Sequence, residues 1–277
     1  WTIILAYPLS LCYLKFGDNM QIIKYTKKGS NKHELTLKDN TKLLVYTDLI
    51  LEYNLLIRKN LDPNTLKEIK SANLKLDCYY KTLKYLKNTK CTSDIKNYLK
   101  DYPSNIVDYT VQRLTKEGYL NDNNYIKSYI NTKINLSNDG YYKIYYYLKN
   151  KDLDETIIKN YLNDIEDNIW LDKINKIVNT KLKSNTKYSN NLLISKIKTY
   201  LKALGYQDYL INIALDNINL DTSKEDEKLE KDYLKLFNKY KNKYEKNKLN
   251  YILIGKLYQK GYDLDKAKRV VETSNLW

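Results

Sequence analysis

The fold is decided by two stretches of sequence that align with each other without a gap: KIYYYLKNKDLDETIIKNYLNDI, residues 143–165, and KIKTYLKALGYQDYLINIALDNI, residues 196–218. The same places are apolar in both copies, beginning with Ile144 in the first and Ile197 in the second and again four residues later. Residues four apart lie on one face of a helix. A second apolar stripe follows after a turn, so each stretch predicts two amphipathic helices joined tightly.

The same pattern occurs twice more. Residues 253–274 repeat it at an offset of 56, and residues 94–114 repeat it once the middle turn is shortened by two residues. Another amphipathic segment precedes each pair, at residues 74–86, 122–134, 169–182 and 229–244. A unit of three helices buries little surface alone and must stack on its neighbours. We predict a mainly α protein, built as an elongated array of tandem three-helix repeats.

The N-terminal part has a shorter periodicity. Alternating segments at residues 21–25, 33–37 and 43–46 predict brief strands, and the Gly, Ser, Asn and Asp residues between them suit turns. A helix is expected at residues 47–58, and Pro63 suits the first turn of the next helix. These elements form a small N-terminal antiparallel β module.

These patterns divide the chain into successive parts. The β module with its helix occupies residues 20–73. The four repeats occupy residues 74–118, 119–166, 167–221 and 222–277.

Residues 1–19 stand apart from these patterns. The chain begins with Trp1, and its only methionine is Met20. The segment is apolar but lacks the basic start of a signal peptide. We interpret it as a doubtful upstream extension, translated from DNA ahead of a native start at Met20. A genuine N-terminal strand or a partial membrane anchor is the alternative.

The charge of the chain leaves two interpretations open. The formal net charge is +15, from 48 Lys and Arg against 33 Asp and Glu. Such a charge suits an anionic partner such as nucleic acid. However, Lys, Asn, Tyr and Ile share A/T-rich codons, and 30 Tyr stand against two Phe. Codon drift therefore explains the lysines equally well.

The chemistry of the chain argues against an enzyme. His33 is the only histidine, which excludes multi-histidine zinc sites and argues against a Ser-His-Asp triad. The seven glycines form no phosphate-binding loop. Acidic residues such as Asp154 and Glu155 fall at the start of a predicted helix, where negative charge favours the helix dipole. We expect no catalytic residue, no metal and no cofactor.

The cysteines and the hydropathy indicate the compartment. Cys12, Cys78 and Cys91 are scattered, and they fit small buried thiols in a reducing cytosol better than a disulfide framework. No apolar run reaches the roughly 18 residues of a membrane span. We predict a cytoplasmic monomer without a membrane partner.

One stretch carries a family resemblance. Residues 113–130, RLTKEGYLNDNNYIKSYI, resemble the RecX signature R-L-x-x-x-G-[YL]-[LI]-[DN]-D, with Gly118 at the turn and Asp122 at the N-cap. Residues 140–153 resemble the family's G-x-x-K-I-x-x-x-L-x-x-K-x-[IL], and residues 83–99 are similar to its opening repeat. The predicted β module looks like that of longer RecX proteins from low-GC bacteria, so the resemblance covers residues 20–277.

The chain departs from the family pattern at several places. The Pro that usually follows the family's Gly is Tyr141, and the family's Phe-Ala pair is Tyr125-Ile126. An Arg-rich stretch in the first repeat is reduced to Lys87 and Lys90. These changes bear on individual contact residues and leave the helical pattern intact.

The resemblance implies a regulator of homologous recombination. RecX proteins lie in the groove of the RecA–DNA filament, where they block its growth or promote its disassembly. They thereby lower RecA's recombinase, ATPase and coprotease activity in DNA repair and the SOS response. The implied partner is the RecA filament, with single-stranded DNA as a second candidate. The alternative is a helical-repeat nucleic-acid-binding module without RecA specificity, which would bind bare DNA with a steep salt dependence.

Basic residues on the helix faces opposite the apolar stripes are the candidate contacts. They form either an ordinary solvated face or a functional basic ribbon. The set comprises Lys81, Lys84, Lys87, Lys90, Arg113, Lys143, Lys149 and Lys151. The tyrosines at positions 141, 142 and 145–147 invite a base-stacking interpretation, but packing is favoured.

Overall fold

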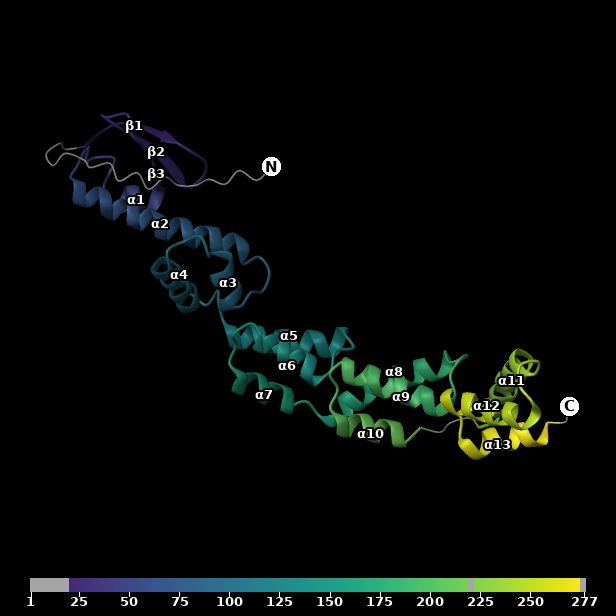
Figure 1. Ribbon diagram of the computed structural model, residues 1–277. Coiled ribbons are helices and arrows are strands. Elements are labelled where there is room, and N and C mark those ends of the chain that lie inside the picture. Colours follow the sequence, from purple (N-terminus) through teal and green to yellow (C-terminus); the bar gives the residue numbers. More distant parts are fainter. Residues whose placement is uncertain (1–19, 219–221, 275–277) are drawn as a thin grey trace. The chain divides into compact units, whose positions relative to one another are not determined.

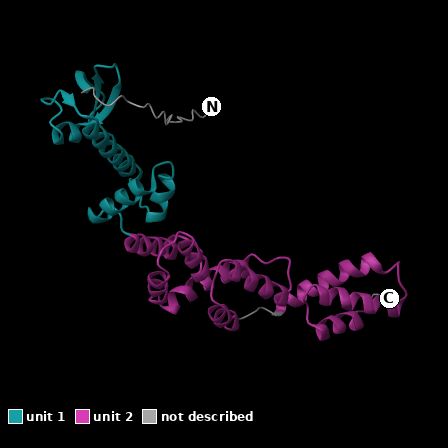
Figure 2. Cartoon of the chain, turned by 60° about the vertical axis from the view of Figure 1, so that its left-hand side comes forward, with its two compact units in different colours: residues 1–121 teal, residues 122–277 magenta. Residues whose placement is uncertain are grey.

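The computed structural model describes residues 20–218 and 222–274 (Figure 1). The chain divides into two compact units, residues 1–121 and 122–277 (Figure 2). The interpretation of residues 1–19 as an upstream extension, and the expectation for Cys12, lie outside the described residues. The expected mainly α fold with a small antiparallel sheet is confirmed, whereas the elongated shape stays a prediction.

The first unit opens with a four-stranded antiparallel sheet in the order β3-β2-β1-β4. Its strands are β1 (Met20–Lys27), β2 (Lys32–Leu37), β3 (Lys42–Tyr46) and β4 (Asn60–Leu61). Side chains on one face, such as Leu35 and Leu37, are buried in the core of the module. The three expected strands are confirmed. A two-residue strand such as β4 is too short to show a period in the sequence.

Helix α1 (Thr47–Glu52) is shorter than the expected helix at residues 47–58. Leu49 and Ile50 are buried as the helical pattern requires, but Asn54 takes a positive φ of 49°, which no helix interior accommodates. The chain then turns toward β4, and Ile57 is left 84% exposed. The expectation of one helix through residue 58 was therefore wrong, because a turn at Asn54 ends it.

Helix α2 (Pro63–Tyr85) is continuous where we expected a boundary between residues 73 and 74. Asp62 caps its start, accepting a hydrogen bond from the backbone N–H of Thr65 at 2.9 Å, and Pro63 occupies the first turn. No Gly or Pro follows before Tyr85, so nothing interrupts the helix. The β module and the first repeat share this helix, and the proposed limit at residue 73 falls inside it.

The helices from α2 onward pack in groups of three. The first group combines α2 with α3 (Thr92–Tyr98) and α4 (Ser104–Lys116). The second unit holds three groups in a row (Figure 2). They are α5 (Asp122–Leu136), α6 (Tyr141–Lys149) and α7 (Glu155–Asn163); α8 (Asp167–Lys183), α9 (Asn190–Ala203) and α10 (Asp208–Asp216); and α11 (Thr222–Tyr240), α12 (Lys246–Gln259) and α13 (Leu264–Thr273).

The aligned apolar positions are the cores of these groups. Leu148, Leu201 and Leu257, which share one place in the repeat, are each 0% exposed. The turn position behind them holds Leu153, Tyr206 or Tyr262, all buried. The helices and the apolar register inferred from the repeat are therefore confirmed. The residue limits assigned to each repeat remain a proposal.

Neighbouring repeats of the second unit meet at a glycine pair. The backbone N–H groups of Gly140 and Tyr142, at the start of α6, donate to the carbonyls of Leu204 and Gly205 at 2.7 and 2.8 Å. A Cβ on Gly140 would lie 2.6 Å from the backbone of Gly205, and a Cβ on Gly205 would lie 2.5 Å from the nitrogen of Lys143. Two backbones approach here as only glycine permits.

The junction between the third and fourth repeats has the same geometry, except that a serine begins the middle helix. Ser189, the N-cap of α9, donates its hydroxyl to the carbonyl of Lys260 at 2.7 Å. A Cβ on Gly261 would lie 2.7 Å from the Ser189 Oγ. In both junctions the start of the middle helix of one repeat packs on the glycine turn of the next, which fixes how the repeats of this unit stack.

Candidate partner-binding surface

Two lysines of the first unit hold a pair of stacked tyrosines between them. The rings of Tyr85 and Tyr98 stack at 4.0 Å with an interplanar angle of 8°. Lys90 Nζ lies 4.7 Å from the Tyr85 ring centroid, and Lys81 Nζ lies 5.4 Å from that of Tyr98. We call these four residues the Lys–Tyr stack. Each cation lies within cation–π range of a ring, so the lysine heads are positioned without being neutralised.

Lys84 and Lys87 flank this stack. Both are exposed, Lys84 on α2 and Lys87 in the turn that follows it. Lys81 and Lys84 are three residues apart and share a side of the helix. Among the residues that the structure describes, no carboxylate forms an ion pair with Lys84 or Lys87. Four of the candidate contacts are thus brought together around the end of α2.

Arg113 belongs to a different environment. Its guanidinium lies 3.8 Å from the Tyr79 ring centroid, and its Nε donates to Glu117 at 2.8 Å. The Tyr79 hydroxyl donates to the same carboxylate at 2.6 Å. Burial and that hydrogen bond raise the pKa of Tyr79 to about 12. This closed network fastens α4 to α2, so packing accounts for Arg113.

The pocket beside Arg113 is mixed in charge. It measures about 560 Å³ and is lined by carboxylates as well as by Lys75, which lies 4.8 Å from the Tyr109 ring centroid. The carboxylates are Asp48, Glu52 and Glu68. Arg113 therefore does not extend the basic surface around the Lys–Tyr stack.

Asp77 connects the sheet to the first repeat. Its carboxylate accepts hydrogen bonds from Lys32 of β2 at 2.8 Å, from Tyr46 of β3 at 2.9 Å and from Tyr102 at 2.7 Å. Burial raises the pKa of Asp77, but these three donors outweigh it and hold that pKa below its ordinary value. Burial also raises the pKa of Tyr46 to about 12.

Two candidate lysines of the second unit are already paired. Lys143 forms an ion pair with Asp139 at 2.6 Å, and Lys149 forms one with Glu155 at 2.9 Å. Hydrogen bonds from Tyr145 and Lys149 lower the pKa of Glu155. The two lysines are six residues apart on α6, which separates them by about 120° around the helix axis. They do not share one face.

Lys151 lies against a ladder of tyrosines. The rings of Tyr125, Tyr129 and Tyr147 stack at centroid distances of 6.2 and 4.4 Å, and we call them the tyrosine ladder. Lys151 is half-buried, with Nζ 5.5 Å from the Tyr147 ring centroid and 6.0 Å from that of Tyr125. It is packed against rings and does not stand on a fully solvated face.

The other tyrosines of α6 divide between packing and solvent. Tyr145 is buried and Tyr141 half-buried, as the packing interpretation expects. Tyr142 and Tyr146 are 45% and 55% exposed, and their rings stack at 6.5 Å. The sequence pattern did not single out Tyr85 or Tyr98. The excess of Tyr over Phe was the only sequence signal that pointed to tyrosine contacts.

The described residues offer no metal site and no membrane span. No group of three or more His, Cys, Asp and Glu within them could hold a metal ion. None of the helices that they form is long and apolar enough to cross a membrane. Cys78 and Cys91 are buried, as predicted for them.

Comparison with known proteins finds similarity to RecX proteins. No protein-family model matches the chain. It is 26% identical over 259 residues to regulatory protein RecX of Staphylococcus epidermidis, which covers 92% of this chain and 97% of that protein. It is 28% identical over 264 residues to RecX of Streptococcus agalactiae serotype Ia, which covers 89% and 97%. The chain is therefore similar to regulatory RecX proteins. Its match to these RecX relatives runs along nearly their whole length.

Solved RecX structures share the fold. A crystal structure of regulatory protein RecX matches with a TM-score of 0.61 at 20% identity, over 72% of this chain and 100% of that one. RecX from Lactobacillus salivarius matches with a TM-score of 0.50 at 24% identity, over 53% of this chain and 99% of that one. The matched part of the chain therefore shares its fold with these RecX structures.

Proposed function

We propose that this protein is a member of the RecX family that binds the RecA filament and restrains it without any chemistry of its own. By the family resemblance, it lies in the helical groove of the RecA–DNA filament and spans several protomers. Binding there blocks filament growth or promotes disassembly. It lowers RecA's strand exchange, ATP hydrolysis and coprotease activity in DNA repair and the SOS response. We also propose that the protein is cytoplasmic and monomeric.

The observation that carries the proposal is the similarity to RecX proteins along nearly their whole length. The repeated architecture supports it physically. Each three-helix group presents a related surface, and a row of such groups can follow a partner that is itself a repeating structure. Weak contacts at regular spacing then sum by avidity.

Lys84 and Lys87 are the contacts we favour within the candidate set. Both are exposed, and the described residues supply no carboxylate partner for either. Lys143, Lys149 and Arg113 already have ion pairs, which would have to break before these cations could bind an acidic partner. An acidic protein groove or the DNA within it would attract the unpaired lysines first.

The test is RecA's DNA-dependent ATP hydrolysis, with RecA from the same organism and increasing amounts of this protein. Inhibition at far less than one copy per several RecA indicates capping of growing filaments, and inhibition that requires about one copy per several RecA indicates lining of the groove. Lys84→Glu with Lys87→Glu should weaken inhibition. Lys67→Glu with Lys70→Glu is the matched control, since both residues are exposed on α2 and change the charge equally.

Two results would overturn the proposal. No inhibition at any ratio would exclude RecA as the target. Tight, salt-sensitive binding to bare single-stranded DNA without any effect on RecA would instead favour a nucleic-acid-binding module.

A further inference from the structure

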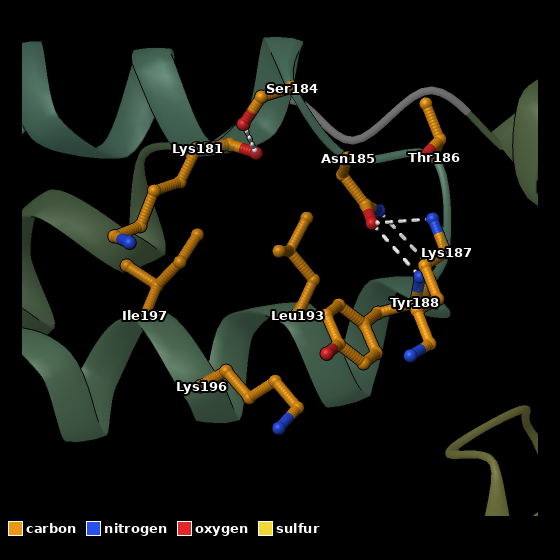
Figure 3. Close-up of a pocket in the computed structure, with 9 residues that line it drawn as sticks. All are labelled: Lys181, Ser184, Asn185, Thr186, Lys187, Tyr188, Leu193, Lys196 and Ile197. Atoms are coloured by element: carbon orange, nitrogen blue, oxygen red, sulfur yellow. Dashed lines mark hydrogen bonds between the residues drawn. The ribbon is translucent and has the colours of Figure 1, made fainter.

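A lysine-lined pocket lies between two helices of the third repeat (Figure 3). Its walls are the end of α8, the following loop and the first turns of α9. The buried side chains of Leu193 and Ile197 lie beneath it, and the ring of Tyr188 stands beside Leu193. Three lysines line it: Lys181, Lys187 and Lys196. We call this site the lysine pocket.

The lysine pocket has no counter-charge. None of its lining residues is acidic, the other polar ones being Ser184, Asn185 and Thr186. Within the described chain, none of the three lysines forms an ion pair, in contrast to Lys143 and Lys149. Lys187 and Lys196 both lie near the Tyr188 ring, and an anion bound beside that ring would offset two positive charges.

Aromatic rings hold the lysine heads in place. Lys181 Nζ lies 3.8 Å from the Tyr200 ring centroid, and Lys196 Nζ lies 4.8 Å from that of Tyr188. Lys187 Nζ lies 5.7 Å from the same Tyr188 ring. A ring attracts a cation without removing its charge, so the ammonium groups keep their capacity to bind an anion.

The loop is organised before any ligand arrives. The Asn185 Oδ1 accepts hydrogen bonds from the backbone N–H groups of Lys187 and Tyr188 at 3.2 and 2.9 Å, and its Nδ2 donates to the Tyr188 carbonyl at 2.8 Å (Figure 3). Lys228 of α11 donates to the Asn185 carbonyl at 3.0 Å. A pre-organised loop spends little entropy on binding.

The size of the pocket selects the ligand. It measures about 220 Å³, below the roughly 300–1,000 Å³ of sites that enclose drug-sized molecules. That volume suits one compact anion with part of its attached group. We infer that the lysine pocket binds the phosphate group of a nucleotide, with the sugar or base against Tyr188 and Leu193. The phosphate comes either from a free nucleotide or from the backbone of single-stranded DNA.

The site does not rest on the proposed RecA function. It involves only residues of the second unit, and the test contains no RecA. The competing explanation is that the lysines only offset the negative end of the α8 dipole. That explanation predicts no ligand.

The test measures binding of inorganic phosphate, dTMP and a dye-labelled dT10 to the full chain. Lys187→Gln with Lys196→Gln should weaken binding about tenfold, because hydrogen bonds to charged groups are lost. Both lysines are exposed, so helicity should be unchanged. The slope of log binding constant against log salt concentration for dT10 should become shallower by about 1.4. Each of the two lost phosphate contacts accounts for about 0.7. Lys67→Gln with Lys70→Gln removes equal charge at two exposed positions of α2 and is the control.

The probes separate the two sources. Binding of dTMP as strong as that of dT10 identifies a free nucleotide, and binding of dT10 alone identifies backbone phosphate. Equal losses in the pocket variant and the control variant would overturn the inference, because the binding would then reflect net charge alone. Absence of binding for all three probes would overturn it as well.

Discussion

At the scale of single residues, Asp77 is a carboxylate on which three side-chain hydrogen bonds of the first unit converge. It takes three hydrogen bonds from Lys32, Tyr46 and Tyr102, which belong to two strands and the turn after α3. Its folded pKa is held below the ordinary value, so the carboxylate stabilises the fold only while it is ionised.

Asp77→Asn should therefore destabilise the first unit at neutral pH. We expect a loss of about 1–2 kcal/mol, discounted because the carboxylate is 36% exposed. Amide exchange in β2, β3 and α2 measures it. Asp101→Asn is the control. Asp101 is exposed in the turn between α3 and α4, so its substitution should change amide exchange little.

The same site predicts a pH dependence with a definite sign. A depressed folded pKa gives stability that is complete above the unfolded pKa of about 3.9 and is lost as pH falls through the folded pKa. The difference in stability between wild type and Asp77→Asn should accordingly shrink as pH is lowered from 5 toward 2. A difference that stayed constant over that range would show that Asp77 acts through packing alone.

Lys151 shows what the sequence could not supply at this scale. Its spacing from the apolar stripe predicts an ordinary solvated lysine, yet it lies against Tyr125 and Tyr147. The partners of a lysine depend on which rings the fold brings to it, and one-dimensional spacing does not contain that information.

Lys151→Ala should cost about 0.5–2 kcal/mol, the range of a cation–π contact at a partly desolvated site. Thermal unfolding of the second unit measures this. Lys127→Ala, at an exposed position on α5, is the comparison and should stay within about 0.5 kcal/mol. Equal melting temperatures for the two variants would contradict the role assigned to the rings.

At the scale of elements, helix identity followed from the sequence and helix ends did not. Apolar spacing placed the helix pairs of all four repeats, because burial imposes the 3.6-residue period. The expected helix end at residue 58 was wrong, and α2 runs through the limit proposed at residue 73, because the apolar period does not set where a helix ends. Asn54 ends the first by adopting a positive φ, and α2 persists because its sequence lacks a breaker.

The glycine junction gives a prediction at this scale. Gly140→Ala should destabilise the second unit by roughly 1–3 kcal/mol, because the new Cβ would lie 2.6 Å from the Gly205 backbone. Gly255→Ala is the opposite case, since it lies inside α12 with nothing within 4 Å of the added atom. That change should stabilise by up to about 1 kcal/mol. Thermal unfolding of both variants would show shifts of opposite sign, and shifts of the same sign would contradict this account of the junction.

At the scale of the whole molecule, the repeats of the second unit are joined through backbone as well as side chains. Besides the glycine junctions, Lys173 of α8 donates to the carbonyls of Lys133, Ile134 and Ser137 at 3.2, 2.7 and 2.8 Å. Burial lowers the pKa of Lys173, which the fold tolerates because the ammonium caps the end of α5. Contacts of this kind couple the stability of one repeat to that of the next.

Coupling between repeats can be measured with Leu148 and Leu201, which hold the same place 53 residues apart and are both 0% exposed. Leu→Ala at either site should cost about 2–5 kcal/mol. Because the start of α6 is hydrogen-bonded to the turn after α9, Leu148→Ala should also speed amide exchange in α9 and α10. Exchange that rose only in α5, α6 and α7 would mean that the repeats unfold independently. Such independence would weaken the groove-lining proposal, because contacts sum by avidity along a filament only when neighbouring repeats are held in a fixed relation.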